Sequence, residues 1–95
     1  MASNIEIQHI EKSKIDSVDF DNLPFGSVFS DHMLECDFVD GEWKTPVIKP
    51  YSPISLDPSS KIFHYGQSIF EGMKAYKDTD ENTLLFRPLE NFKRL

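Results

Sequence analysis

Arg87 is the residue whose type and position most favour chemistry in this sequence. It ends the strand-like run 83–87 and directly precedes Pro88, which suits the first turn of a helix. The amino end of a helix offers free N–H groups and the positive end of a dipole, and arginine adds a planar fork of donors. The position could bind an anion, but Pro88 removes one donor, and on these residues alone an ordinary surface ion pair is the favoured interpretation.

Aromatic side chains are the second group with chemical potential, at 13% of the chain. Phe25 stands out because it lies in a turn-like stretch, Leu23-Pro24-Phe25-Gly26. A loop phenylalanine beside a glycine can line an apolar pocket, or it can pack as a staple onto the core. The remaining aromatic residues, Tyr65 and Phe70 among them, fit a hydrophobic core equally well.

Metal and nucleophile motifs are absent from the sequence. His9, His32 and His64 are scattered, with no pair at the i, i+4 spacing of helical metal ligands. Cys36 lies among apolar residues, where a small core role is typical. No Gly-x-Ser-x-Gly, phosphate-loop or dinucleotide fingerprint appears, so metal-dependent and serine-hydrolase chemistry are not predicted.

The elements that must position these residues begin with extended structure. Alternation at residues 5–7 predicts a short edge strand, and the apolar run 28–39 predicts a longer one. Asp40-Gly41 is a strong reversal signal. A second extended run, 43–48, is flanked by Pro46 and Pro50 and is therefore placed at a sheet edge, because proline cannot donate to the ladder.

The second half of the chain predicts helix and hairpin. Apolar spacing predicts a helix over 60–71, capped by Ser59 or Ser60 and ended by Gly72 as the C′ residue. Residues 73–77 and 83–87 predict a β-hairpin across the polar link 78–82, followed by a final helix from Pro88. This order predicts an α+β fold, a small domain with a mostly antiparallel sheet and helices packed on it.

Length and charge restrict the function classes. The chain has 95 residues, a net charge of −6 and one cysteine. It predicts a single domain, and its acidity disfavours nucleic acid. Without an 18-residue apolar run or a visible signal peptide, neither a membrane span nor secretion is predicted, and a reducing, cytoplasmic compartment fits.

Three stretches together resemble the branched-chain amino-acid aminotransferases, class-IV enzymes of pyridoxal phosphate. The first reads Phe-Gly-Ser-Val-Phe-Ser-Asp-His-Met from Phe25. The second reads His-Tyr-Gly-Gln-Ser-Ile-Phe-Glu-Gly-Met-Lys-Ala-Tyr from His64. The third is Leu-Phe-Arg-Pro from Leu85, followed by Asn91 and Arg94-Leu95. We interpret residues 1–22 as an amino-terminal segment with the edge strand, and 23–95 as most of the family's smaller, amino-terminal domain, ending inside a helix.

The resemblance implies roles for four residues. Arg87 matches the arginine that binds the cofactor phosphate, in agreement with the anion argument. Phe25, Tyr65 and Phe70 match residues that line the apolar side-chain pocket, some of which reach the neighbouring subunit's active site. An aromatic slot suits a branched aliphatic side chain, and the Tyr65 hydroxyl adds a polar group for glutamate.

The implied function is transfer of the amino group of leucine, isoleucine or valine to 2-oxoglutarate through pyridoxal phosphate. The resemblance also implies a cytoplasmic homodimer in branched-chain amino-acid biosynthesis, with no nucleic-acid or membrane partner. In the family the Schiff-base lysine follows the arginine motif, so we expect it beyond Leu95 and expect this chain alone to be inactive. Lys74 and Lys77 match no catalytic position.

Two other functions stay open at this point. One is another class-IV enzyme of the cofactor, such as a D-amino-acid aminotransferase or an aminodeoxychorismate lyase. The other is a stand-alone interaction domain without enzymatic activity, which the short length alone supports.

Overall fold

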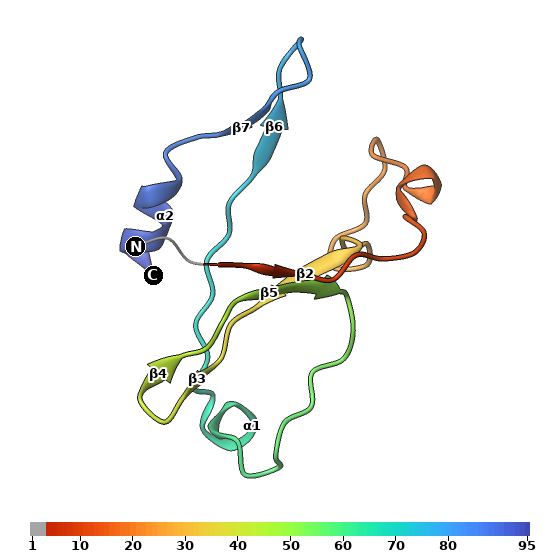
Figure 1. Ribbon diagram of the computed structural model, residues 1–95. Helices are drawn as coiled ribbons and strands as arrows, with labels where there is room; N and C mark the ends of the chain where they lie inside the picture. The colour runs from red at the N-terminus through yellow and green to blue at the C-terminus, as the bar shows by residue number, and fades with distance from the viewer. Residues whose placement is uncertain (1–3) are drawn as a thin grey trace. The chain divides into compact units, whose positions relative to one another are not determined.

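The computed structural model describes residues 4–95, and its chain forms two compact units, Met1–Ile54 and Ser55–Leu95. The elements follow the order β1, η1, β2, β3, β4, β5, α1, β6, β7 and α2 (Figure 1). Three of the four strand pairings in the described residues are antiparallel. The α+β class and the mostly antiparallel pairing predicted from the sequence are confirmed.

A three-stranded sheet forms the centre of the first unit, in the order β1 (Glu6–Ile7), β5 (Val47–Pro50), β2 (His32–Glu35). β1 is an edge strand, as predicted, and pairs in parallel with β5, whereas β2 pairs with β5 antiparallel. A short 3-10 helix, η1 (Ile15–Ser17), follows β1.

The prediction that the 43–48 run lies at a sheet edge is wrong, because β5 is the central strand. The prolines do not interrupt the ladder there. Pro46 precedes the strand and accepts a hydrogen bond from the Glu6 N–H at 3.0 Å through its carbonyl group, which needs no N–H. Pro50 is the last residue of β5, opposite His32, where a missing donor costs little.

The single strand predicted over 28–39 is two strands. β2 ends at Glu35, and β3 (Phe38–Val39) pairs instead with β4 (Glu42–Trp43). Asp40 and Gly41 both have positive φ, 52° and 80°, as a tight reversal of type I′ requires. The predicted turn is therefore confirmed, and the strand that leads into it is shorter than the apolar run because Cys36 and Asp37 leave the ladder.

The first helix of the second unit, α1 (Lys61–Tyr65), is less than half as long as the predicted 60–71. Gly66 ends it in the left-handed conformation, at φ 61° and ψ 27°, and its N–H donates to the Lys61 carbonyl. The apolar spacing continued past Gly66, but glycine has little preference for the helix interior and enters this cap without steric cost. Ser60 is the N-cap residue, although its side chain makes no capping hydrogen bond.

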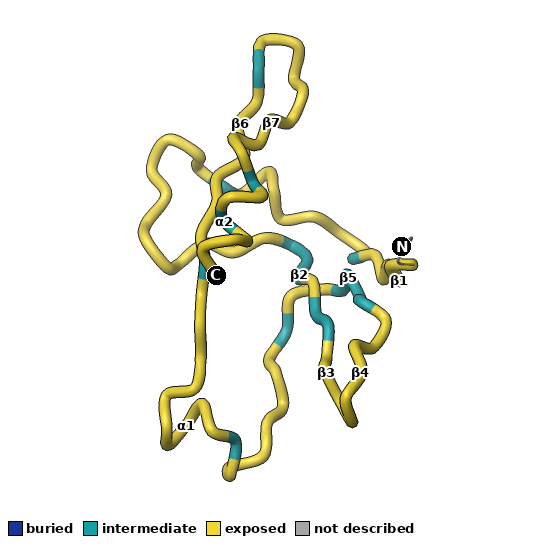
Figure 2. Tube along the Cα trace, turned by 90° about the vertical axis from the view of Figure 1, so that its left-hand side faces the viewer, coloured by how far each residue is buried: buried dark blue, intermediate teal, exposed yellow. Residues whose placement is uncertain are grey.

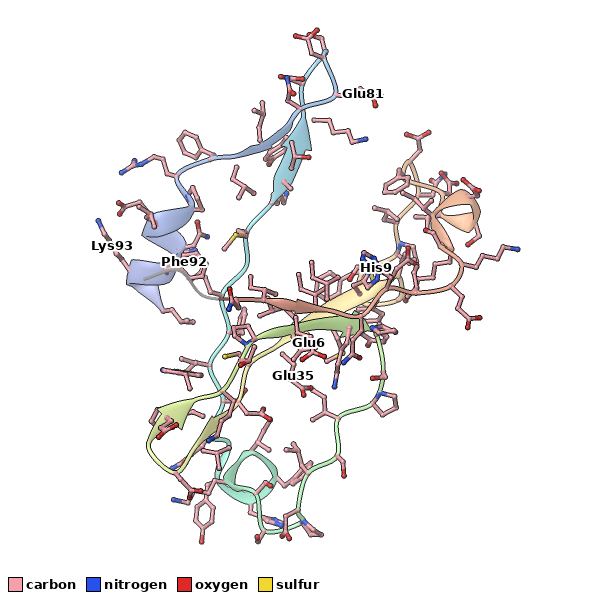
Figure 3. All side chains as sticks on the ribbon, in the orientation of Figure 1. Glu6, His9, Glu35, Glu81, Phe92 and Lys93 are labelled. Carbon is pink, nitrogen blue, oxygen red and sulfur yellow. The ribbon has the colours of Figure 1, made fainter. Side chains whose placement is uncertain are left out.

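The predicted hairpin and final helix are confirmed, with β6 (Ala75–Lys77) antiparallel to β7 (Thr83–Leu85) and α2 (Pro88–Arg94) starting at the proline. Glu81 lies in the turn of this hairpin (Figure 3). The Asp78 carboxylate stabilises the turn by accepting hydrogen bonds from the Asp80 and Asn82 N–H groups, both at 2.8 Å. Hydrogen bonds from the Asn82 N–H and the Asn82 side chain, and to a smaller extent from the Asp80 N–H, hold the pKa of Asp78 below its ordinary value.

Apolar side chains remain accessible throughout residues 4–95. Figure 2 shows intermediate and exposed positions along the tube, and no residue of the described chain is fully buried. Within the same residues there is no cluster of histidine, cysteine and carboxylate side chains suited to a metal ion, and no helix long and apolar enough to cross a membrane.

Candidate functional site

Arg87 lies at the junction of β7 and α2, where its backbone is left-handed at φ 46° and ψ 55°. Pro88 disfavours the right-handed helical region for the residue before it, so the helix starts at Pro88 and Arg87 makes the turn. The Arg87 carbonyl accepts a hydrogen bond from the Glu90 N–H at 3.1 Å, which closes the first helical turn. β7 ends at Leu85, two residues short of the predicted run 83–87, so Arg87 follows the strand rather than ending it.

The Arg87 guanidinium has one weak partner among the described residues. Its Nη2 lies 3.8 Å from Glu90 Oε1, and the side chain is 67% exposed. Lys93 reaches the same carboxylate oxygen more closely, at 3.3 Å. An exposed pair of this length contributes about 0–1 kcal/mol. The surface ion pair that the sequence left open is therefore present, but it holds Arg87 only loosely.

The helix itself adds little to an anion site beside Arg87. α2 has seven residues, and its first, Pro88, has no N–H. Free N–H groups and the helix dipole thus contribute less to anion binding than the sequence suggested. The main contribution comes from the Arg87 guanidinium, which is planar and exposed and carries five donors.

A hollow of about 210 Å³ opens beside Arg87. Two guanidinium groups, one amide and one carboxylate contribute to its wall, which consists of Phe86, Arg87, Glu90, Asn91 and Arg94. The Arg87 guanidinium in this wall is suited to an anion with several oxygen atoms, whereas Asn91 and Arg94 already donate to Glu71.

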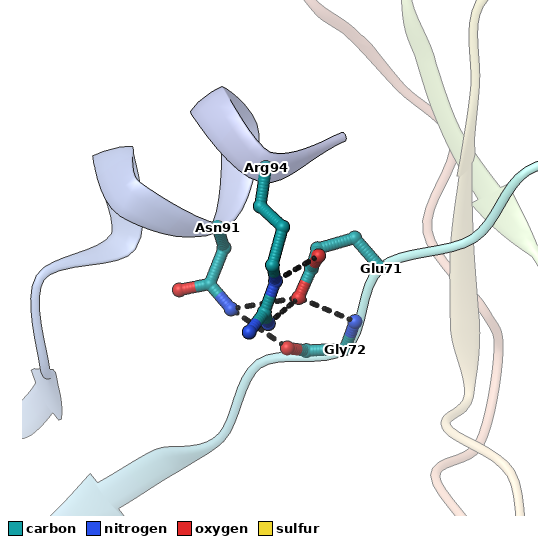
Figure 4. Close-up of polar contacts among 4 residues, drawn as sticks. All are labelled: Glu71, Gly72, Asn91 and Arg94. Carbon is teal, nitrogen blue, oxygen red and sulfur yellow. Dashed lines mark hydrogen bonds and ion pairs between the residues drawn. The ribbon is translucent and has the colours of Figure 1, made fainter.

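Glu71 and Gly72 bind the C-terminal half of α2 (Figure 4). The Glu71 carboxylate accepts hydrogen bonds from Arg94 Nε at 2.8 Å and from Arg94 Nη2, so the ion pair is bidentate. Asn91 Nδ2 donates to Glu71 Oε1 at 3.1 Å and to the Gly72 carbonyl at 2.8 Å. The Gly72 N–H donates to Glu71 Oε1 at 3.2 Å. We refer to Glu71, Asn91 and Arg94 as the Glu71 clamp.

Charges in the clamp are matched. Hydrogen bonds from Arg94 and then from Asn91 lower the pKa of Glu71 from 4.5 to about 2, against a smaller opposing effect of desolvation. Glu71 in turn raises the pKa of Arg94. Both groups are therefore charged at neutral pH, and the Arg94 cation is neutralised by Glu71 while Arg87 keeps most of its charge available.

The aromatic residues predicted to line a pocket lie in different units. Phe25 is in the first unit, in a turn where the Ser27 N–H donates to the Pro24 carbonyl at 3.4 Å and Gly26 has φ 71°. Tyr65 and Phe70 are in the second unit, at the end of α1 and in the irregular stretch after it. Their exposed fractions are 104%, 78% and 93% for Phe25, Tyr65 and Phe70, so each ring is available to a partner surface.

Sequence reasoning assigned no role to the clamp residues, although all three lie in the motifs quoted above. Asn91 and Arg94 are three residues apart on a helix and therefore share a face, which is a signal that was available. Their partner Glu71 lies 20 and 23 residues earlier, beyond the reach of any local pattern. The hairpin between them brings the two segments together.

Comparisons with known proteins agree with the fold and the motifs. A branched-chain-amino-acid transaminase of Bacillus subtilis is 53% identical over 78% of this chain and 21% of its own length. A second enzyme of that organism, a branched-chain-amino-acid aminotransferase, is 46% identical over 96% of this chain and 24% of its own. The cytosolic branched-chain-amino-acid aminotransferase of Saccharomyces cerevisiae is 46% identical over 99% of this chain and 25% of its own.

The relatives named above are all aminotransferases, and this defines the class of enzyme to which the chain is similar. More specifically, over nearly its whole length the chain is homologous to the branched-chain-amino-acid aminotransferases, and the resemblance stated from the motifs is confirmed. The chain spans about a quarter of the length of these curated relatives. No protein-family model matches it.

Proposed function

We propose that the whole protein that carries this chain is a branched-chain-amino-acid transaminase. It transfers the amino group of leucine, isoleucine or valine to 2-oxoglutarate and uses pyridoxal phosphate. Support comes from relatives of that name, which are 46–53% identical over most of the chain. These names favour the branched-chain group over the D-amino-acid and lyase alternatives, and they disfavour a stand-alone interaction domain.

The observation that carries the cofactor proposal is the Arg87 guanidinium at the wall of an anion-suited hollow, held only by a pair at 3.8 Å. These residues fit a phosphate group, because an arginine fork can donate two parallel hydrogen bonds to its oxygens. Phosphate displaces the weak Glu90 contact at little cost. When bound, pyridoxal phosphate supplies the electron sink on which transamination depends.

In this proposal Phe25, Tyr65 and Phe70 line the substrate side-chain slot and exclude water from it. Their rings are exposed in this chain, and burial of such a side chain stabilises by roughly 1.5–3 kcal/mol. The substrate and the rest of the enzyme are the surfaces that would cover them. The Tyr65 hydroxyl gives the slot a polar group for the carboxylate of glutamate or 2-oxoglutarate.

The other parts of the proposal concern the whole protein. We place the Schiff-base lysine in the three quarters of the enzyme that this chain does not span, so the 95 residues alone are inactive. We also propose a homodimer in the cytoplasm, which accords with the cytosolic location in the name of the yeast relative.

Activity and cofactor binding of the purified whole protein test the proposal. Leucine with 2-oxoglutarate should be turned over, whereas D-alanine should not. Arg87→Ala should weaken the affinity for pyridoxal phosphate by about tenfold or more, since it removes a charge-assisted bidentate contact.

Lys93→Ala is the matched control. Lys93 is another cation of α2 that pairs with Glu90, and its removal should leave cofactor affinity unchanged. Turnover of D-alanine in preference to leucine would refute the substrate, and equal cofactor affinity of Arg87→Ala and Lys93→Ala would remove Arg87 from the phosphate site.

A further inference from the structure

We propose that the Glu71 clamp is a positioning device that sets the direction of α2 and thereby holds Arg87 where it meets the cofactor phosphate. The inference rests on the proposed function of Arg87 and adds three residues to it. None of the three contacts Arg87 in the ion pairs and hydrogen bonds of the structure, so they act through the backbone.

The need for such a device follows from the conformation of Arg87. A left-handed backbone costs a residue with a side chain about 1–2 kcal/mol, and Arg87 adopts it at φ 46°. The local support is one Arg87–Glu90 backbone hydrogen bond and the loose ion pair at 3.8 Å. Strained backbone of this kind persists where the surrounding structure holds it in place.

The clamp supplies that hold by closing a loop of chain. From Gly72 the backbone runs through β6, the hairpin turn and β7 to Arg87, and then into α2. Asn91 and Arg94 return to Glu71 and Gly72, so the start and the end of this path are joined by side-chain bonds (Figure 4). With both ends joined, α2 cannot swing about Arg87 without breaking a bidentate ion pair and two amide hydrogen bonds.

The clamp is better formed than the other ion pairs of this unit. The Glu71 side chain is 12% exposed, although its partner Arg94 is 71% exposed. The side chains of Glu81 and Glu90 are 84% and 52% exposed and have lysine or arginine partners at 3.3–3.9 Å. Bidentate arginine–carboxylate pairs add geometric specificity that single contacts lack. A specific and partly desolvated pair is what the fixing of one helix direction requires.

Charge must be balanced in the test, because Arg94 lines the same hollow as Arg87. Removal of Glu71 alone would free the Arg94 cation, which would itself attract phosphate. The double variant Glu71→Gln/Arg94→Gln removes the clamp without a change in net charge. Its matched control is Lys77→Gln/Glu81→Gln, which removes an exposed i, i+4 pair at 3.9 Å in the same unit.

The readout is the ratio of affinities for pyridoxal phosphate and for pyridoxal, measured on the whole apoenzyme. The clamp variant should lower the affinity for pyridoxal phosphate by about tenfold, the lower end of the effect seen when groups that orient metal ligands are removed. Its affinity for pyridoxal should change less than about twofold, since pyridoxal has no phosphate. The control variant should match the wild type for both ligands.

Each alternative outcome is decisive. Equal loss of both ligands would mean a general structural role, and wild-type affinity for both would mean that the clamp does not position Arg87. Either outcome leaves the ratio unchanged and overturns the proposal. If the double variant does not fold, Arg94→Lys takes its place. Lysine keeps the positive charge but lacks the guanidinium fork, so the ratio of the two affinities should fall to a smaller extent. An unchanged ratio in that variant would also overturn the proposal.

Arg87→Ala, measured in parallel, separates this inference from the proposed function. If Arg87→Ala lowers the ratio and the clamp variant does not, the clamp proposal alone is refuted. If Arg87→Ala leaves the ratio unchanged, the phosphate role of Arg87 is refuted, and the clamp proposal with it.

Discussion

Gly66 should tolerate alanine poorly. It ends α1 at φ 61°, a conformation that costs a residue with a Cβ about 1–2 kcal/mol. An added Cβ would meet nothing within 4 Å, so the backbone cost is the only one in the folded state. Loss of glycine also reduces the entropy of the unfolded chain, which stabilises by about 0.4–1 kcal/mol. The net destabilisation of Gly66→Ala is therefore about 1 kcal/mol.

The effect is local, and hydrogen exchange of the whole protein is the suitable assay. The Gly66 and Gln67 N–H groups both donate to the Lys61 carbonyl, the latter at 3.3 Å. A loss of about 1 kcal/mol in local stability should make these amides exchange about fivefold faster. Gly66→Asn should have a smaller effect, because asparagine tolerates the left-handed conformation.

Gly72→Ala is the control, since Gly72 has no positive φ and an added Cβ there also meets nothing within 4 Å. Its exchange at residues 66 and 67 should equal that of the wild type. If Gly66→Ala and Gly72→Ala behave alike at these amides, the left-handed cap is not formed in solution and the explanation for the short α1 is refuted.

Two further predictions concern carboxylates of the second unit. The pKa of Glu71 is lowered from 4.5 to about 2. Its stabilising contribution is therefore fully present above about pH 4.5 and is lost as the pH falls through about 2. A ¹³C NMR titration of the Glu71 carboxylate with a midpoint near 4.5 would show that the Arg94 ion pair is absent. Asp78→Ala should accelerate amide exchange at Asp80 and Asn82, which lose their acceptor, whereas Asp78→Asn keeps one oxygen and should preserve most of the protection. Equal exchange in the two variants would contradict this account of the turn.

Local signals in the sequence predicted several elements correctly. Asp40-Gly41 and the polar link 78–82 predicted two reversals, because these residues accept positive φ or hydrogen-bond their own backbone. Pro88 predicted the start of α2, since within a helix its fixed φ and missing N–H are compatible with the first turn alone. In each case a single residue type restricts its own backbone, so no tertiary information is needed.

Non-local pairing accounts for the errors. Pro46 and Pro50 suggested an edge strand, yet β5 is central, because its neighbours are drawn from residues 6–7 and 32–35, and the prolines lie where no donor is needed. Periodicity placed α1 over 60–71, but it could not show that Gly66 takes the left-handed cap. Hydrophobic spacing indicates which side chains favour burial, but it does not indicate which backbone groups form hydrogen bonds with one another.

The sequence by itself determined the α+β class, the turns, the Arg87-Pro88 junction and the homology to branched-chain-amino-acid aminotransferases. These features depend on residue type and on short spacings, both of which can be read directly from the sequence. The tertiary structure decided the central position of β5 and the Glu71 clamp, in which Asn91 and Arg94 bind a carboxylate 20 and 23 residues away. Such bonds form only when the intervening hairpin brings α2 back beside Glu71, and this geometry requires the pairing of β6 with β7.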